Sequence, residues 1–260
     1  MIIKNGLTQE LEGFLLVDKP TGTTSTYCLT KIKRTIGKKG KVGHTGTLDM
    51  FATGLLIVGI GRPATKHLSE AMELDKRYSA TGKLGQLTDT LDLTGITLEE
   101  ESISHITAAD IEEAIKKIGT QYHQVPPIYS ALKHQGRHLS RLARGQQYTQ
   151  EELEQIAVEK GRDITIYSCA LTNFSLPFFS IEAHVSHGTY IRTLINDIAR
   201  NAGTVATTHV LRRLSIGPFS IDDALPLAQL ATYEVVAASA IPIQQFIDRI
   251  AEYQLPQNPI

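Results

Sequence analysis

One stretch of strict alternation does most to limit how this chain can fold. Over residues 179–186 apolar and polar side chains alternate, with the apolar positions at Phe179, Ile181, Ala183 and Val185. Such a pattern predicts a β-strand with one buried face and one polar face. A helix is predicted directly after it, from about Thr189 to Asn201. The first turn of that helix should therefore lie at the end of a sheet.

Other segments show weaker versions of the same two patterns. Strands are predicted at residues 13–17, 55–59 and 77–84, with a polar loop at 85–95. One helix is predicted to begin at N-cap candidates from Thr23 to Ser25 and to end at Gly37. Others are predicted from Pro63 to about Leu74, from a start at Thr107 to Asp110 as far as Ile118, and from Ile243 to Ala251. Residues 145–162 predict an inserted loop or a short helix. Because strands and helices mix without regular β-α-β alternation, we expect an α+β fold with a mixed, largely antiparallel sheet flanked by helices.

Residues 43–54 contain three glycines and three threonines around one histidine, His44, and one carboxylate, Asp49. Glycine permits backbone conformations that other residues avoid, so this stretch predicts a shaped loop rather than a helix or strand. The apolar run at residues 55–58 would anchor that loop on a buried strand. A carboxylate in such a place serves either as a catalytic group or as a cap for backbone amides in a turn. Spacing alone leaves both roles open.

The same stretch resembles the active-site motif of the pseudouridine synthases of the TruB family, which usually reads GHTGTLDPLATG. Further blocks resemble the family in the same order along the chain, at residues 13–25, 75–92, 124–133, 186–192 and 210–213. The resemblance therefore covers roughly residues 10–225, and it implies a long mixed sheet flanked by helices with the active-site cleft across it.

The resemblance implies an enzyme that isomerises the T-loop uridine of tRNA, at position 55, to pseudouridine. The reaction breaks the bond between the ribose and N1 of uracil, rotates the base and rejoins it through C5, with no cofactor and no metal. Asp49 is the implied catalytic group. It would attack the sugar or the base covalently, or remove the C2′ proton to give a glycal, and the sequence leaves these routes open.

The resemblance also implies roles for four residues around the target nucleotide. Arg192 would pair with Asp49, and Tyr78 would stack on the extruded uracil. Tyr190 would pack below the pocket and orient Arg192 or Asp49. Leu211 would form an apolar wall. Without the family context, Tyr78 reads as a strand tyrosine in the core and Arg192 as a surface group.

Three more residues are implied to act around the loop. His44 would enter the RNA stack in the place of the flipped base, and Lys19 and Pro20 would support the loop from beneath. Two departures from the family pattern stand out: Met50-Phe51 replaces the usual Pro-Leu, and His187 stands where a lysine is common. Neither change alters the proposed catalytic groups.

Charge is unevenly distributed on a chain whose formal net charge is −1. Two acid-free clusters run from Lys31 to Lys41 and from Lys133 to Arg144. A third set comprises Arg192, Arg200, Arg212 and Arg213, opposed only by Asp197. Each set alone is compatible with an ordinary solvated helix face. Together, beside the motifs, they predict a basic face that contacts the phosphates of tRNA, mainly its T-arm.

The rest of the sequence limits location and organisation. Residues 1–6 lack the apolar core of a signal peptide, no apolar run reaches the length of a membrane span, and the two cysteines suggest neither a disulfide framework nor a metal site. We expect a cytoplasmic monomer without a metal or cofactor. We expect residues 1–236 to form the catalytic domain, and residues 237–260 to form a short helix and tail without a complete PUA-type RNA-binding domain.

Three other functions compete with this one. The chain could be a tRNA-binding or tRNA-folding factor without catalysis, a pseudouridine synthase for another RNA, or a small-molecule isomerase or lyase. The intact set of Asp49, Tyr78 and Arg192 argues against the first, the small C-terminal segment against guide-dependent action on other RNAs, and the basic clusters against the last.

Overall fold

The computed structural model describes residues 3–4, 7–8, 11–37, 40–145 and 148–255. These residues fall into two units. The first takes the chain as far as Lys76 and again from Arg212 onwards, and the second comprises Arg77–Leu211. Each unit is described by itself.

The first unit contains a sheet whose strands run in the order β16-β3-β5-β14, with β4 also paired to β5 and β15 to β14. The strands of the first unit are β1 (Ile3–Lys4), β2 (Leu7–Thr8), β3 (Gly13–Lys19), β4 (Val42–His44), β5 (Thr53–Ile60), the end of β14 (Ala206–Ile216), β15 (Phe219–Ser220) and β16 (Leu225–Pro226). Its helices are α1 (Ser25–Thr35), α2 (Arg62–Thr65), α3 (Leu68–Met72), the 3-10 turn η1 (Ile221–Asp223), α8 (Tyr233–Ala238) and α9 (Ile243–Gln254).

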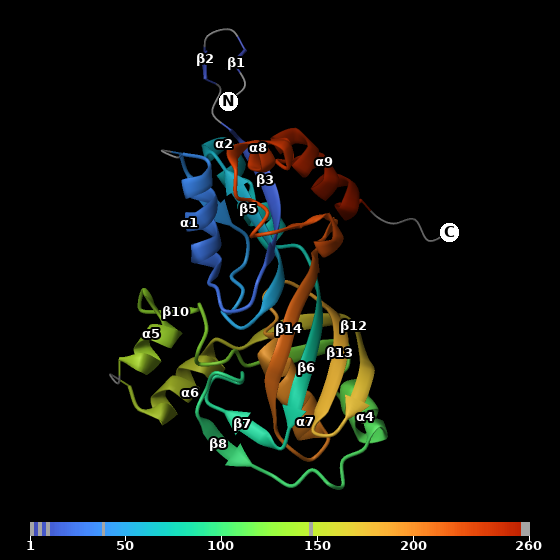
Figure 1. Cartoon of the computed structure of the whole chain (residues 1–260). Helices are drawn as coiled ribbons and strands as arrows, with labels where there is room; N and C mark the ends of the chain where they lie inside the picture. Colours follow the sequence, from blue (N-terminus) through green and yellow to red (C-terminus); the bar gives the residue numbers. More distant parts are fainter. Residues whose placement is uncertain (1–2, 5–6, 9–10, 38–39, 146–147, 256–260) are drawn as a thin grey trace. The chain divides into compact units, whose positions relative to one another are not determined.

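Helices cover both faces of this sheet, with α1 and α9 on opposite sides of β3 and β5 (Figure 1). Leu55 and Ile57 on β5 pack on the side of α2, α3 and α9. Leu56 and Val58 pack on the other side, with α1 and α8. Because successive side chains of a strand point to opposite faces, a strand covered on both faces must be apolar throughout. This explains the continuous apolar run after the glycine-rich stretch.

The second unit contains a sheet in the order β14-β6-β13-β12-β9. Its strands are β6 (Lys76–Leu84), which begins on the last residue of the first unit, β7 (Gln86–Thr88), β8 (Thr97–Glu100), β9 (Gln121–Gln124), β10 (Lys133–His134), β11 (Arg137–His138), β12 (Arg162–Ser175), β13 (Phe178–Val185) and the start of β14. Its helices are α4 (Ala108–Ile118), α5 (Leu139–Arg144), α6 (Gln150–Glu159) and α7 (Ile191–Asn201).

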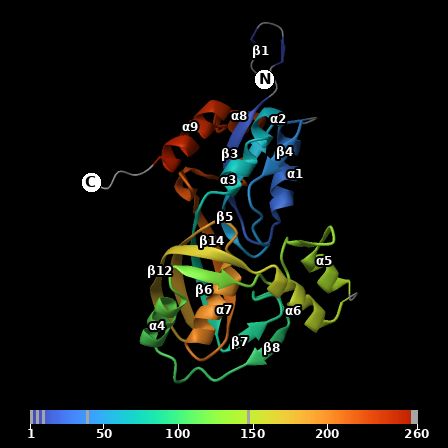
Figure 2. The same cartoon turned by 180° about the vertical axis from the view of Figure 1, so that it is seen from behind.

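Helix α7 packs closely on the buried face of β6 and β13 (Figure 2). A Cβ at Gly82 would lie 2.5 Å from Phe179 on β13 and 2.8 Å from Ile195 on α7. Only glycine leaves room for the helix at this point of β6. Helix α4 contacts both α7 and β12. A smaller cluster of buried side chains joins α5 to α6.

The structure confirms the expected α+β class and several elements. The strand predicted at 179–186 is β13, Phe178–Val185, and the helix after it, α7, ends at Asn201 as predicted. Helix α4 begins after Thr107, whose hydroxyl accepts from the Asp110 N–H while the Asp110 carboxylate accepts from the Thr107 N–H. Residues 145–162, predicted as an inserted loop or a short helix, contain the helix α6. Residues 146–147 lie outside the described ranges.

Other predictions were wrong or incomplete. The helix expected from Pro63 to Leu74 is two short helices, α2 and α3, and the expected loop at 85–95 contains β7. Helices α5 and α8 and most of the long strand β12 had no clear sequence pattern. The helix near the C-terminus reaches Gln254 rather than Ala251. The predicted boundary at residue 236, between the catalytic domain and the C-terminal helix and tail, stays a prediction. Residues 256–260 lie outside the described part.

The glycine-rich stretch 43–54 is only partly a loop. Its first two residues belong to β4 and its last two begin β5. Gly43 lies in a strand and packs close to α3, because a Cβ there would lie 2.9 Å from the end of the Leu68 side chain. The glycines of this stretch therefore have two roles, in the loop and in close packing of strands, which the sequence pattern did not distinguish.

Candidate active site

The backbone on both sides of Asp49 is held by the segment that joins β3 to α1. The Ser25 hydroxyl accepts a hydrogen bond from the Leu48 N–H at 3.0 Å and donates to the Leu48 carbonyl at 3.3 Å. The Gly22 N–H donates to the Met50 carbonyl at 2.8 Å. Both chain neighbours of Asp49 are therefore bonded, which restricts the backbone that carries the half-buried carboxylate.

Lys19 is fully buried beneath this loop. Its Nζ donates to the carbonyls of Thr23 at 2.8 Å, Pro20 at 3.0 Å and Met50 at 3.5 Å. Burial lowers the pKa of Lys19 below its usual value, and the nearby Asp49 carboxylate acts in the opposite direction. Lys19 thus ties the end of β3 to the residue that follows Asp49. Pro20 is exposed and contributes its carbonyl.

Arg213 holds the two ends of the same loop. This arginine is only 2% exposed. Its Nε donates to the Leu55 carbonyl at 2.7 Å, and its Nη2 donates to the Gly46 carbonyl at 3.0 Å. One guanidinium therefore joins the two ends of the segment that presents Asp49. A planar group with several donors in fixed geometry suits this bridging role.

The residues that depart from the family pattern leave these bonds intact. Met50 is 53% exposed and enters the hydrogen bonds through its carbonyl oxygen, which every residue type provides. Phe51 is half-buried, and its carbonyl accepts from the Thr21 hydroxyl at 2.9 Å. His187 is exposed, in the turn that precedes α7.

His44 lies on β4, half-buried. Its Nδ1 is buried without a hydrogen-bond partner among the described residues. Burial lowers the pKa of His44 below its usual value, so the ring is neutral at pH 7. A neutral aromatic ring fits a stacking role better than a proton-transfer role.

Tyr78 and Leu211 belong to the second unit. Tyr78 is 8% exposed and lies on the buried face of β6, the face that also carries Gly82. Leu211 is 6% exposed, on β14. Burial of this degree is compatible with a core position for Tyr78 as well as with a pocket wall, so its proposed role stays a prediction.

Tyr190 and Arg192 lie at the start of α7. Tyr190 is the N-cap residue of the helix. The Arg162 guanidinium lies 5.5 Å from the centre of its ring. Arg192 is 4% exposed, so it is not the surface group that a first-turn arginine usually is. It donates to the carbonyl of Tyr129 at 2.8 Å and also to that of Thr90.

A carboxylate accompanies Arg192 within the same unit. The Asp92 Oδ2 lies 3.7 Å from Arg192 Nη1, and both side chains are at least nine-tenths buried. The other oxygen, Oδ1, accepts from the Thr94 hydroxyl at 2.6 Å and from the Thr90 hydroxyl at 2.9 Å. The two threonine hydroxyls hold the Asp92 carboxylate in place beside Arg192. Together with the two carbonyls, this carboxylate holds the Arg192 guanidinium in one orientation.

The predicted site residues thus form two sets. Within the first unit, Lys19, Pro20 and Asp49 belong to one hydrogen-bonded region. Within the second, Tyr190 and Arg192 share the start of α7. The predicted pairing of Asp49 with Arg192 joins residues of different units, and it stays a prediction.

Sequence reasoning missed three residues that hold the site: Ser25, Arg213 and Gln124. Gln124, on β9, is 1% exposed and bonds to the backbone of Tyr190. All three stand in or beside the motif blocks, which was the one available signal. Their partners lie far along the chain, so no local pattern indicated what they contact.

The structure corrects part of the predicted basic face. Arg192 and Arg213 are buried, and Arg212 and Arg200 are paired with Asp18 and Glu99, each at 2.8 Å. The first two are therefore not available to contact phosphates. The other two clusters fit the prediction better, because the following basic residues are exposed: Lys33, Arg34, Lys41, Lys133, Arg137, Arg141 and Arg144. Lys38 and Lys39 lie outside the described residues.

No described helix is both long and apolar enough to cross a membrane. Likewise, no three His, Cys, Asp or Glu side chains of the described residues gather where they could hold a metal ion.

Comparison with known proteins assigns the chain to a family. Residues 33–191 match the family described as TruB family pseudouridylate synthase (N terminal domain). The chain belongs to the TruB family. Among its TruB-family relatives, the tRNA pseudouridine synthase B of Bordetella avium is 42% identical over 224 residues, which cover 85% of this chain and 88% of that protein.

Other relatives are longer than this chain. Pseudouridylate synthase TRUB1 of Homo sapiens is 39% identical over 233 residues, which cover 83% of this chain but 64% of the human protein. This TruB-family chain therefore spans slightly less than two thirds of the human relative. A solved structure of a Cbf5-Nop10-Gar1 complex matches with a TM-score of 0.68 and 23% identity, over 92% of this chain and 62% of that one. At this identity the match supports the fold alone.

Proposed function

We propose that this chain is a tRNA pseudouridine synthase that isomerises the T-loop uridine at position 55 to pseudouridine. The names of its relatives support the reaction and the substrate class. The observation that carries the proposal is the bonded backbone around Asp49, which is held by Ser25, Gly22, Lys19 and Arg213. A reactive carboxylate must keep its position through the reaction, and a bonded backbone on both sides of Asp49 supports this role.

The reaction is a rearrangement within one nucleotide. The N1–C1′ bond breaks, the base turns, and a C5–C1′ bond forms while the C5 proton is lost and N1 gains one. Asp49 is the proposed group that attacks the sugar or base, or removes the C2′ proton. The route stays open, because one carboxylate can serve each of them.

The remaining site residues have proposed roles carried over from the resemblance. Arg192 pairs with Asp49 and keeps it ionised in an apolar pocket. Tyr78 stacks on the extruded uracil, with Tyr190 beneath the pocket and Leu211 as a wall. His44 fills the place left in the RNA stack, and its lowered pKa, caused by burial, leaves a neutral ring for that purpose.

The test is to incubate the protein with unmodified tRNA transcripts and map pseudouridine at nucleotide resolution. The wild type should modify the T-loop uridine alone. Asp49→Asn should retain tRNA affinity and lose turnover by more than a thousandfold, because the amide keeps the shape and loses the reactive oxygen charge. Asp163→Asn is the matched control, since its carboxylate is 84% exposed and it should leave the rate unchanged.

The competing functions give different outcomes. Tight tRNA binding without any pseudouridine indicates a non-catalytic binding or folding factor. Pseudouridine in another RNA but not in tRNA indicates a different substrate. Appreciable turnover by Asp49→Asn contradicts the role of Asp49. We further propose that the protein acts as a cytoplasmic monomer. Light scattering with and without tRNA tests the oligomeric state.

A further inference from the structure

The side chain of Gln124 makes a pair of hydrogen bonds to the backbone of one residue, Tyr190. Its Oε1 accepts from the Tyr190 N–H at 2.7 Å, and its Nε2 donates to the Tyr190 carbonyl at 3.0 Å. Gln124 is 1% exposed, so water does not compete for these bonds. A primary amide matches a backbone N–H and carbonyl in this way because it carries one acceptor and one donor side by side.

These bonds act at the start of α7. Tyr190 is the N-cap residue, with φ −95° and ψ 107°, and its own side chain makes no capping bond. The backbone angles at Tyr190 decide the direction in which the helix leaves the sheet. Arg192 follows two residues later, so the backbone at Tyr190 sets the point from which the Arg192 side chain reaches its partners, the carbonyls of Thr90 and Tyr129.

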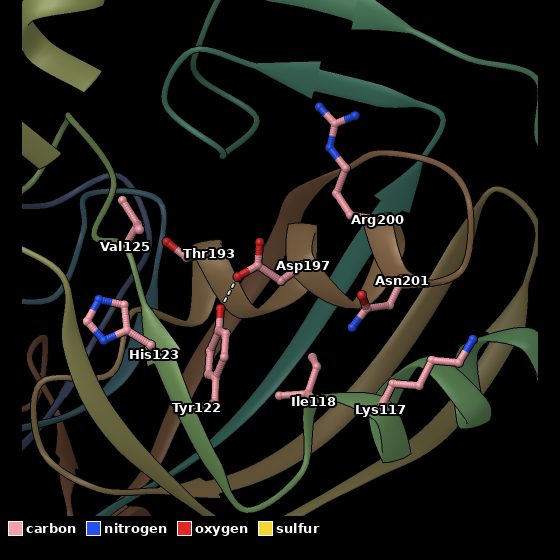
Figure 3. A pocket seen from close by; sticks show the side chains of 9 residues that line it. All are labelled: Lys117, Ile118, Tyr122, His123, Val125, Thr193, Asp197, Arg200 and Asn201. Carbon is pink, nitrogen blue, oxygen red and sulfur yellow. Dashed lines mark hydrogen bonds between the residues drawn. The ribbon is translucent and has the colours of Figure 1, made fainter. Parts of the chain in front are cut away.

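A second side chain of the same strand holds the same helix. Tyr122 precedes Gln124 by two residues on β9, so both point to the same side of the strand. The Tyr122 hydroxyl donates to the Asp197 carboxylate, as the dashed line in Figure 3 shows. Asp197 lies seven residues after Tyr190, which is about two helical turns. Strand β9 therefore bonds α7 at two points on one face.

The space beside the second bond is not filled by side chains. A cavity of about 480 Å³ opens there, with Tyr122, Thr193 and Asp197 among the residues that line it (Figure 3). A helix packed on all sides is held in register by its core contacts, whereas here part of the helix face borders a hollow. On this side of α7 the hydrogen bonds from β9 add to the core contacts that the helix makes with β6 and β13.

We propose that Gln124 is a positioning residue for the isomerisation: it holds the backbone of Tyr190 and thereby the orientation of Arg192. It acts through these residues and does not touch the substrate. This inference rests on the proposed function. It assigns to Gln124 a contribution to the rate of the chemical step rather than to tRNA binding.

The test compares two substitutions on one strand. Gln124→Met keeps the side-chain length and removes both bonds. Gln121→Met is the matched control, because Gln121 is exposed on β9 and its amide donates to the Thr165 hydroxyl of β12 at 3.1 Å, away from α7. We expect kcat at saturating tRNA to fall about 10- to 100-fold in Gln124→Met, since small displacements of a catalytic arrangement cost about that much. The Kd for tRNA should stay within about twofold, and Gln121→Met should match the wild type.

Amide hydrogen exchange measures the contact directly. The Tyr190 N–H should exchange faster in Gln124→Met, while amides in the middle of α7 keep their protection. If Gln124→Met does not fold, Gln124→Asn replaces it, because the shorter amide cannot make both bonds and should give an intermediate kcat.

Two outcomes overturn the inference: a kcat within twofold of the wild type, or a loss that appears equally in kcat, Kd and melting temperature. Failure of the proposed function looks different. In that case the wild type itself forms no pseudouridine in any tRNA, while the exchange rate of the Tyr190 amide still shows whether Gln124 holds the helix start.

Discussion

Gly54 lies directly against the backbone of Arg213. A Cβ at position 54 would stand 2.3 Å from the Arg213 carbonyl oxygen and 2.6 Å from its nitrogen. The two residues face each other in the parallel pairing of β5 with β14. This close approach places the Arg213 side chain where it reaches the carbonyls of Leu55 and Gly46. The position of the Arg213 side chain, which holds the loop, therefore depends on a glycine at position 54.

Gly54→Ala should destabilise the protein strongly. The backbone at Gly54 has φ +107°, which an alanine adopts only with strain, and the added methyl meets backbone atoms that cannot move aside. Strain and overpacking together should cost at least about 3 kcal/mol. Gly37→Ala is the control, because it shares a positive φ but a Cβ there meets no atom of the described residues within 4 Å, so it should cost about 1 to 2 kcal/mol. Urea unfolding of both variants measures the difference, and equal losses would show that the close approach does not matter.

Substitutions at Tyr78 should separate stacking from hydroxyl chemistry. Tyr78→Phe keeps the ring, so tRNA binding should persist and only steps that need the hydroxyl should slow. Tyr78→Ala removes the ring, and both kcat and the melting temperature should fall, because a large side chain that is 8% exposed leaves a cavity. Single-turnover rates and thermal unfolding check this. If the two variants resemble the wild type in binding and turnover, Tyr78 does not hold the base.

Asp197 should make the stability depend on pH. Burial raises the pKa of Asp197 from 3.8 to about 6, although the Arg200 guanidinium acts in the opposite direction. The folded state therefore holds the proton more tightly than the unfolded state. The resulting stability is fully present below about pH 4 and is lost as the pH rises through about 6.

Asp197→Asn should remove this dependence, because the amide oxygen still accepts from Tyr122 and carries no charge. The free energy of unfolding of the wild type, relative to Asp197→Asn, should fall by about 2 to 3 kcal/mol between pH 4 and pH 7. Urea titrations of both proteins across that range measure it, and other titrating groups cancel in the difference. A constant difference would mean that the pKa of Asp197 is not raised.

Exposed basic residues of the two remaining clusters should supply part of the attraction to tRNA. Replacing Lys33 and Arg34, or Lys133 and Arg141, by alanine should weaken binding to all RNAs and leave kcat at saturating tRNA near the wild-type value. Removing one phosphate interaction should reduce the slope of log Kd against log salt by about 0.7 to 0.9. Lys116→Ala is the control, since Lys116 is exposed on α4 outside the clusters. An unchanged slope in the cluster variants would contradict the basic face.

Local patterns were enough to predict some of this structure. The alternation that became β13, the helix α7 and the capped start of α4 each depend on neighbours within a few residues, so periodicity and capping residues reported them correctly. The motif blocks were likewise sufficient to indicate the family and to select Asp49 as the catalytic candidate.

Tertiary contacts decided what the patterns left open. Arg213 bonds to a residue 158 positions away and becomes buried, whereas composition had grouped it with surface bases. Gly43 and Gly54 lie in strands, and other parts of the chain approach both of them closely. Gln124 reaches across 66 positions to the start of α7. The physical reason is common to all of these residues. The structural role of a buried polar group or of a glycine depends on the atoms that it contacts, and these come from distant parts of the sequence.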